Sequence, residues 1–143
     1  MPPMRKPASR TTRRPVSRKS PGFQPHLEPL EPRLALAVSQ SYGTWSITGD
    51  ADPAHPNDTI LVDRSPTNAA HLRATINGVV VGTILESKVK TIRIVGGAGD
   101  DTITINIPGN TRIKTQIYGN VGNDTIHGGD GSDSINGGPG NDK

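Results

Sequence analysis

The 143-residue sequence contains no cysteine, few aromatic residues and no long apolar run. Without cysteine, disulfide bonds and thiolate metal sites are excluded. Aromatic residues make up 3% of the chain and hydrophobic residues 31%, which is too little apolar material for an ordinary globular core. No apolar stretch approaches the roughly 18 residues that a membrane-spanning helix needs, so no transmembrane segment is predicted. The 17 glycines and 13 prolines favour a turn-rich solenoid or a disordered chain.

The net charge of +3 combines two parts of opposite sign. Residues 1–40 carry +6 and residues 41–143 carry −3, so the high isoelectric point belongs to the first part. Residues 1–26 are rich in proline, arginine and serine and lack acidic residues, which predicts a disordered basic leader. No aromatic residues alternate with the basic ones and no nucleic-acid-reading fold follows. A targeting role is therefore favoured, and nucleic acid is not a predicted partner.

From residue 41 onward the sequence changes to short β-type segments separated by turn signals, and no helical pattern follows residue 40. Thr102–Ile107 alternates strictly, so its three isoleucines face one way and its polar residues the other. Asn77-Gly78 lies between two apolar runs and is a strong hairpin signal, so Leu72–Leu85 is predicted to be antiparallel. The predicted strands are Gly43–Thr48, Thr59–Val62, Leu72–Ile76, Val79–Leu85, Val89–Val95, Thr102–Ile107 and Thr111–Tyr118.

A nine-residue period occupies the end of the chain. Its most complete unit is Gly128–Asn136, GGDGSDSIN, which follows the pattern G-G-x-G-x-D-x-U-x with U a large aliphatic residue. The preceding unit is Gly119–His127, GNVGNDTIH, and a detached copy, GGAGDDTIT, lies at Gly96–Thr104. The opening of another unit, GGPGNDK, begins at Gly137. A disordered Gly/Asp-rich tail would not require aspartate and isoleucine at fixed offsets, so the period predicts a structured repeat.

Each unit combines a tight turn with a short strand. Glycines adopt positive φ without a Cβ clash, so six residues can turn sharply and aim several carbonyl oxygens inward. The sixth residue, Asp133 in the unit at 128–136, adds a carboxylate. Carboxylate and carbonyl oxygens in a flexible loop suit Ca²⁺, which takes roughly six to eight oxygen ligands. The next three residues form a strand that points Ile135 inward.

These units resemble the RTX, or hemolysin-type, calcium-binding repeats of secreted bacterial proteins. The resemblance implies a parallel β-roll in which Ca²⁺ lies between successive turns on the same side. Asn120 departs from the pattern at a glycine position, and asparagine tolerates the left-handed region better than most residues. By this resemblance the ligand side chains are Asp101, Asp124, Asp133 and Asp142, and the turn glycines are Gly96, Gly97, Gly99, Gly119, Gly122, Gly128, Gly129, Gly131, Gly137, Gly138 and Gly140.

The spacing of the glycine turns predicts how they stack. Turns begin at Gly96, Gly119 and Gly137, and if each interval is one coil the three turns lie on one side. One calcium is then expected between Asp101 and Asp124 and another between Asp124 and Asp142. The Pro108–Asn110 and Gly128–Asp133 turns fall on the opposite side, where Asp133 has no stacking partner. Stacked carboxylates about 5 Å apart repel one another, so folding should be coupled to the metal.

Two further segments bear weaker signals. Asn57-Asp58-Thr59-Ile60 fits the second half of a repeat, but Pro53 and Pro56 replace glycines, so calcium is not expected there. Leu27–Ala37 resembles the LEPR-XLL motif near the N-terminus of large repeat-rich surface or secreted proteins, notably in planctomycetes, which implies an export or sorting tag. The alternative is an ordinary proline-rich linker. The matching residues are Leu30, Glu31, Pro32 and Arg33, followed by Leu34 and Leu36.

No constellation of catalytic residues is recognisable, and the four histidines are scattered, so no enzyme is predicted. The sequence predicts an all-β protein with a leader (1–40), a β-rich segment (41–95) and the start of a β-roll (96–143). We expect a calcium-binding structural module, extracellular or at the cell surface, whose partner there is unidentified. An adhesion or matrix module stiffened by calcium is one alternative. Because the sequence stops inside a repeat, an N-terminal fragment of a larger calcium-dependent exported enzyme is the other.

Overall fold

The computed structural model describes residues 38–49, 54–110 and 112–143. The basic leader up to residue 37 and the LEPR-like motif lie outside these ranges. The described residues form strands almost throughout, and their one helical element is a short 3₁₀ turn, η1 (Glu86–Lys88), so the all-β prediction is confirmed. The strands are β1 (Val38–Ser41), β2 (Thr44–Thr48), β3 (Thr59–Arg64), β4 (His71–Ile76), β5 (Val79–Leu85), β6 (Thr91–Ala98), β7 (Thr102–Asn106), β8 (Lys114–Val121), β9 (Thr125–His127) and β10 (Ser132–Asn136).

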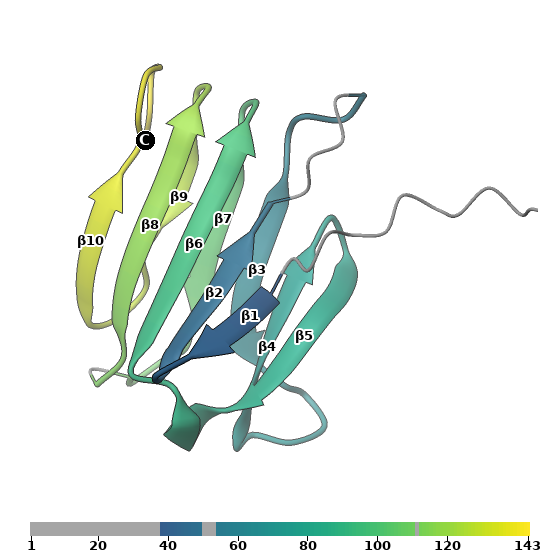
Figure 1. The fold of residues 1–143 in the computed structure, drawn as a ribbon, viewed down its shortest axis with the longest axis vertical. Helices are drawn as coiled ribbons and strands as arrows, with labels where there is room; N and C mark the ends of the chain where they lie inside the picture. The colour runs from purple at the N-terminus through teal and green to yellow at the C-terminus, as the bar shows by residue number, and fades with distance from the viewer. Residues whose placement is uncertain (1–37, 50–53, 111) are drawn as a thin grey trace, which may run out of the picture. The chain divides into compact units, whose positions relative to one another are not determined.

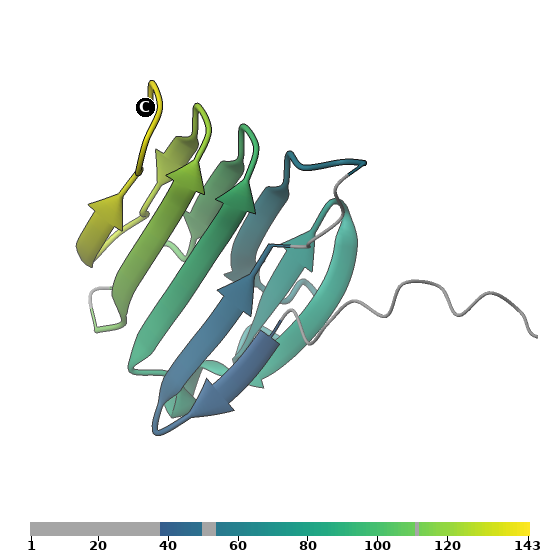
Figure 2. The same cartoon turned by 45° about the horizontal axis from the view of Figure 1, so that its top comes forward.

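The chain coils through two five-stranded sheets. The first has the order β1-β2-β6-β8-β10 and the second the order β5-β4-β3-β7-β9. Strands β2, β6, β8 and β10 are parallel neighbours, as are β3, β7 and β9. Successive coils therefore contribute one strand to each sheet, and Figures 1 and 2 show the two sheets lying face to face. This arrangement is the predicted parallel β-roll.

Columns of isoleucine fill the space between the sheets. In the first sheet, Ile47, Ile94 and Ile117 lie in register and are fully buried. Ile60, Ile103 and Ile126 form the facing column in the second sheet. Each coil buries a few aliphatic residues on its inward positions, so a thin core suffices despite the lean composition. Ile135 continues the first column on the edge strand β10 and is 49% exposed.

The predicted hairpin is confirmed. Strands β4 and β5 are antiparallel, and their turn has positive φ at Asn77 (50°) and Gly78 (80°), as the tight hairpin turn requires. β4 also pairs with β3, so the hairpin extends the second sheet, while β1 pairs antiparallel with β2 and extends the first. The two extensions meet, because a Cβ added to Gly82 would lie 2.8 Å from Val38 Cγ2. Strand β1 is absent from the predicted strands, because its four residues show no alternating apolar pattern.

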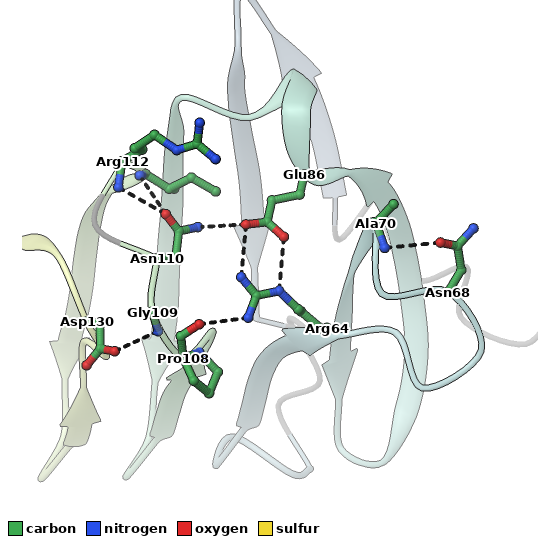
Figure 3. Close-up of polar contacts among 10 residues, drawn as sticks. Arg64, Asn68, Ala70, Glu86, Pro108, Gly109, Asn110, Arg112 and Asp130 are labelled. Atoms are coloured by element: carbon green, nitrogen blue, oxygen red, sulfur yellow. Dashed lines mark hydrogen bonds and ion pairs between the residues drawn. The ribbon is translucent and has the colours of Figure 1, made fainter.

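A polar network joins the turns at one end of the coils (Figure 3). The Arg64 guanidinium donates two hydrogen bonds to the Glu86 carboxylate, both 3.1 Å, and a third of 2.8 Å to the carbonyl of Pro108. Asn110 is 7% exposed, and its Oδ1 accepts the main-chain N–H groups of Arg112 and Ile113. Its Nδ2 donates to Glu86 at 3.3 Å. Side-chain hydrogen bonds therefore join the turns at this end.

Replacing Asn110 with alanine should lower the free energy of unfolding by about 2 kcal/mol, because two main-chain donors lose their acceptor. Calcium affinity should not change, since this network lies at the opposite end of the coils from the stacked Asp101 and Asp124. Urea unfolding with and without calcium would measure both quantities. If Asn110→Ala lowered the calcium affinity as well as the free energy of unfolding, the two ends would not be independent.

Candidate metal centre

The glycine turns stack at the other end of the coils. The turns that follow β6 and β8 lie side by side at the top of Figure 1. The strand register places Gly96 beside Gly119, because Val95 pairs with Tyr118 and Gly97 with Asn120. The turn after β10 begins with Gly137 and follows the same register, since Tyr118 pairs with Asn136. The predicted stacking of three glycine turns on one side is confirmed.

Gly49 and Asp58 also lie in this stack, a position that was not predicted from the sequence. Thr48 pairs with Val95, so Gly49 lies beside Gly96, and the Gly49 N–H donates to the carbonyl of Val95 at 2.8 Å. Asp58 is 2% exposed and takes the place that Asp101 has in the next coil. The signal was Asn57-Asp58-Thr59-Ile60, which keeps the register of a repeat although Pro53 and Pro56 stand at the glycine positions of the pattern.

The aspartates form a ladder of hydrogen bonds, which we call the inner ladder. Oδ1 of Asp101 accepts the main-chain N–H of Asp58 at 2.8 Å. Oδ1 of Asp124 accepts the N–H of Asp101 at 2.8 Å, and Oδ1 of Asp142 accepts the N–H of Asp124 at 3.0 Å. Each carboxylate is therefore held through one oxygen by the coil before it.

The second carboxylate oxygen has no partner at two of these positions. Asp101 is 1% exposed and Asp124 is fully buried, yet Oδ2 of each lacks a hydrogen bond. Leaving a buried carboxylate oxygen unpaired is costly in a folded protein. Two orphaned anionic oxygens on one side of the coils are what a site for a cation would present.

Each orphaned oxygen lies in a cradle that only glycine leaves open. A Cβ on Gly96 would overlap Oδ2 of Asp101 and would lie 2.8 Å from the carbonyl oxygen of Gly119. A Cβ on Gly119 would overlap Oδ2 of Asp124 and would lie 2.6 Å from the carbonyl oxygen of Gly137. Carboxylate and carbonyl oxygens from neighbouring coils thus converge on one point, as hard-oxygen coordination of Ca²⁺ requires.

The electrostatics of the inner ladder also favour a cation. Burial raises the pKa of Asp101 from its usual 3.8 to about 6, and the charges of Asp124, Asp58 and Asp100 contribute to this rise, while the hydrogen bond from the Asp58 N–H opposes it. A bound cation stabilises the ionised carboxylate and so lowers its pKa. Keeping Asp101 ionised therefore opposes folding, and a bound metal would offset this cost.

The residue before each aspartate forms a second ladder, not predicted from the sequence, which we call the outer ladder. Oδ1 of Asn57 accepts the N–H of Asp100 at 2.9 Å, and Oδ1 of Asp100 accepts the N–H of Asn123 at 2.7 Å. Oδ1 of Asn123 accepts the N–H of Asn141 at 3.0 Å. The signal was the repeated pair Asn-Asp or Asp-Asp, whose first member occupies a position that the pattern leaves variable.

The remaining predicted site residues lie apart from the inner ladder or within its turns. Asp133 is exposed on β10 at the opposite end, where its partner in the neighbouring strand is Thr115, whose hydroxyl donates to it. Asp133 therefore lacks a stacked carboxylate, as predicted. Asn120 adopts φ 77°, which confirms that asparagine serves at this glycine position. Positive φ is found at the predicted turn glycines Gly97, Gly99, Gly122, Gly129, Gly131, Gly138 and Gly140. At Gly128, as at Gly96, Gly119 and Gly137, an added Cβ would overlap the carboxylate of the aspartate in the same turn.

Within the described part of the chain, no three His, Cys, Asp or Glu side chains converge on one point. A metal at the inner ladder would therefore take one or two carboxylates and complete its shell with main-chain carbonyl oxygens. Such a donor set, without nitrogen or sulfur, fits Ca²⁺ and disfavours zinc and other transition metals.

Comparison with known proteins agrees with this chemistry. Residues 93–104 and 115–143 match the RTX calcium-binding nonapeptide repeat, in four copies. The chain therefore carries hemolysin-type RTX repeats, whose cofactor is Ca²⁺, and this repeat family is not an enzymatic one. Proteins with such repeats are typically exported or extracellular. No match was found among curated proteins or among solved structures. None of the helices in the described residues is long and apolar enough to cross a membrane.

Proposed function

We propose that this chain is a calcium-stabilised structural module of an exported or cell-surface protein, with two calcium ions on its inner ladder. The observation that carries the proposal is the pair of buried, unpartnered Oδ2 atoms of Asp101 and Asp124. Residues 96–143 supply the proposed ligands, and residues 41–95 supply the first coil and the hairpin that extends the sheet.

The first ion is assigned to the interval between the Asp101 and Asp124 turns, where Oδ2 of Asp101 and the carbonyl of Gly119 converge. The second is assigned to the interval between the Asp124 and Asp142 turns, where Oδ2 of Asp124 and the carbonyl of Gly137 converge. Bound calcium would neutralise the negative charge of these buried carboxylates. Asp133 is not assigned as a ligand, because it is exposed and faces a threonine.

Calcium would couple folding to the environment of the protein. Extracellular calcium modules bind at roughly 10⁻⁴–10⁻³ M, which is far above the calcium concentration inside cells. Before export the carboxylates of the inner ladder would oppose folding, and outside the cell the metal would relieve that repulsion. The roll would then become rigid only where the protein acts.

A calcium titration of the full chain tests the proposal, with far-UV circular dichroism and thermal melts as the measurements. At free calcium about 100 times the dissociation constant, each site should add about 2.7 kcal/mol to the free energy of unfolding. Magnesium should have little effect, because it demands shorter bonds and near-octahedral geometry. An unchanged spectrum and melting temperature up to about 10 mM calcium, well above the extracellular range, would refute the proposed function.

A further inference from the structure

At the first step of the inner ladder, the hairpin provides a hydrogen-bond donor. At the later steps, Oδ1 of each buried carboxylate is held by a main-chain N–H of the coil before it. Asp58 belongs to the first coil, so no earlier coil stands beside it in the described structure. Its Oδ1 instead accepts a hydrogen bond of 2.7 Å from Nδ2 of Asn77, in the turn between β4 and β5.

Asn77 forms three hydrogen bonds with Asp58 and Thr59. Besides the bond to Asp58, Oδ1 of Asn77 accepts the N–H of Thr59 at 2.9 Å. The main-chain N–H of Asn77 also donates to the carbonyl of Thr59 at 2.9 Å. The side-chain amide therefore acts as donor and acceptor toward two consecutive residues, in the way that a neighbouring strand of the coil would.

The hairpin turn alone does not explain why asparagine stands here. Asparagine, aspartate and glycine are all accepted at the first central position of this turn type. The contact to Asp58 discriminates among them, because only asparagine supplies an N–H donor to a carboxylate that is 2% exposed. Aspartate would set a second carboxylate against the first, and glycine would offer nothing.

We propose that Asn77 is a positioning residue for calcium: it substitutes for a preceding repeat and fixes the first step of the inner ladder. The inference rests on the proposed function. Asn77 holds the Asp58-Thr59 segment, the Asp58 N–H holds Oδ1 of Asp101, and this contact leaves Oδ2 of Asp101 aimed at the Gly96 cradle. The influence of Asn77 should therefore be strongest at the Asp101–Asp124 interval and weaker at the Asp124–Asp142 interval.

The test compares Asn77→Asp and Asn77→Gly in the full chain, by calorimetric calcium titration. Asn77→Asp keeps the acceptor for Thr59 and the tolerance of positive φ, but replaces the donor to Asp58 with an acceptor. Loss of a hydrogen bond to a buried charge should weaken calcium binding at the first interval about tenfold or more. Asn77→Gly, which keeps the turn and adds no charge, should fall between wild type and Asn77→Asp.

Site-resolved hydrogen exchange separates positioning from general stability. In both variants the Asp58 and Asp101 N–H groups should exchange faster, while the Asp124 N–H, held by Asp142, should change least. Asn68→Gly is the matched control, because Asn68 also supports a turn, through the N–H of Ala70, but does not touch the ladder (Figure 3). Its calcium affinity should equal that of wild type.

The outcomes distinguish the two proposals. If wild type responds to calcium but all three residues at position 77 give the same affinity and the same exchange at Asp101, the positioning role is wrong. If Asn77→Asp does not fold, Asn77→Gly alone decides, because a role limited to the turn predicts no loss for glycine. If wild type itself ignores calcium, the proposed function fails, and the positioning of calcium by Asn77 fails with it.

Discussion

Replacing Asp124 with asparagine is expected to abolish most of the stabilisation that calcium gives this protein. Asp124 is fully buried, its Oδ2 has no partner, and it borders both proposed calcium intervals. In the Asp124→Asn variant the amide oxygen can still accept the N–H of Asp101, whereas an NH₂ group replaces the orphaned oxygen. Calcium affinity should fall at least about 100-fold, or roughly 2.7 kcal/mol, measured by titration calorimetry.

The same substitution should act in the opposite direction without metal. Because it removes an uncompensated buried charge, the calcium-free variant should be at least as stable as calcium-free wild type. Urea unfolding with chelator and with excess calcium would show whether the variant is the more stable protein without calcium and the less stable one with it. A variant destabilised equally in both conditions would show that Asp124 serves packing rather than metal binding.

Asp133→Asn is the matched control for this experiment. It makes the same chemical change at the same position of a nonapeptide unit, but Asp133 is exposed and faces Thr115 instead of another carboxylate. Its calcium affinity should stay within about twofold of wild type, as is usual for an exposed substitution. An equal loss at both positions would indicate a third site at the opposite end of the coils.

Gly119→Ala should block the second calcium interval by steric means alone. Its backbone does not have positive φ, so the added methyl group introduces no conformational strain. That methyl group would overlap Oδ2 of Asp124 and would lie 2.6 Å from the carbonyl oxygen of Gly137, which is main chain and cannot rotate away. Overpacking should cost about 1–3 kcal/mol in stability, and the second calcium should not bind.

Gly128→Ala tests whether the clash or the position matters. The three atoms nearest to the methyl group there all belong to the Asp133 side chain, which is exposed and whose carboxylate can turn away. This variant should bind calcium as wild type does, with a loss of stability below about 1 kcal/mol. Stoichiometry from calorimetry separates the two variants, since only Gly119→Ala should lose one of the two ions.

The nine-residue pattern is sufficient to predict the coil and the side on which its turns stack. Glycines and an aspartate at fixed offsets specify the turn, and two turns per coil follow from the intervals of 23 and 18 residues. The inward isoleucines follow from the period of two along a strand. These features are local, so they can be read along the chain.

The missed features depend on contacts between coils. Asp58 joins the inner ladder because β3 pairs with β7 and so places Asp58 beside Asp101, although Pro53 and Pro56 stand at glycine positions of the nonapeptide pattern. The outer ladder of Asn57, Asp100 and Asn123 arises only when the turns lie side by side. Likewise Asn77 is recognisable in the sequence as a hairpin residue, but its bond to Asp58 requires the hairpin to fold back onto the first coil.

The two ladders bond in opposite directions, and this limits where the sequence can change in length. An inner-ladder side chain accepts an N–H from the coil before it, and an outer-ladder side chain accepts one from the coil after it. Deleting or inserting one residue in a glycine turn would break contacts to both neighbours at once. At the other end of the coils, the loop that includes Pro108 makes one coil 23 residues long where the next has 18, without disturbing either ladder. Insertions should accordingly be tolerated better in that loop than within Gly96–Asp101, Gly119–Asp124 or Gly137–Asp142, three spans of equal length in which the aspartate is fixed by the inner ladder.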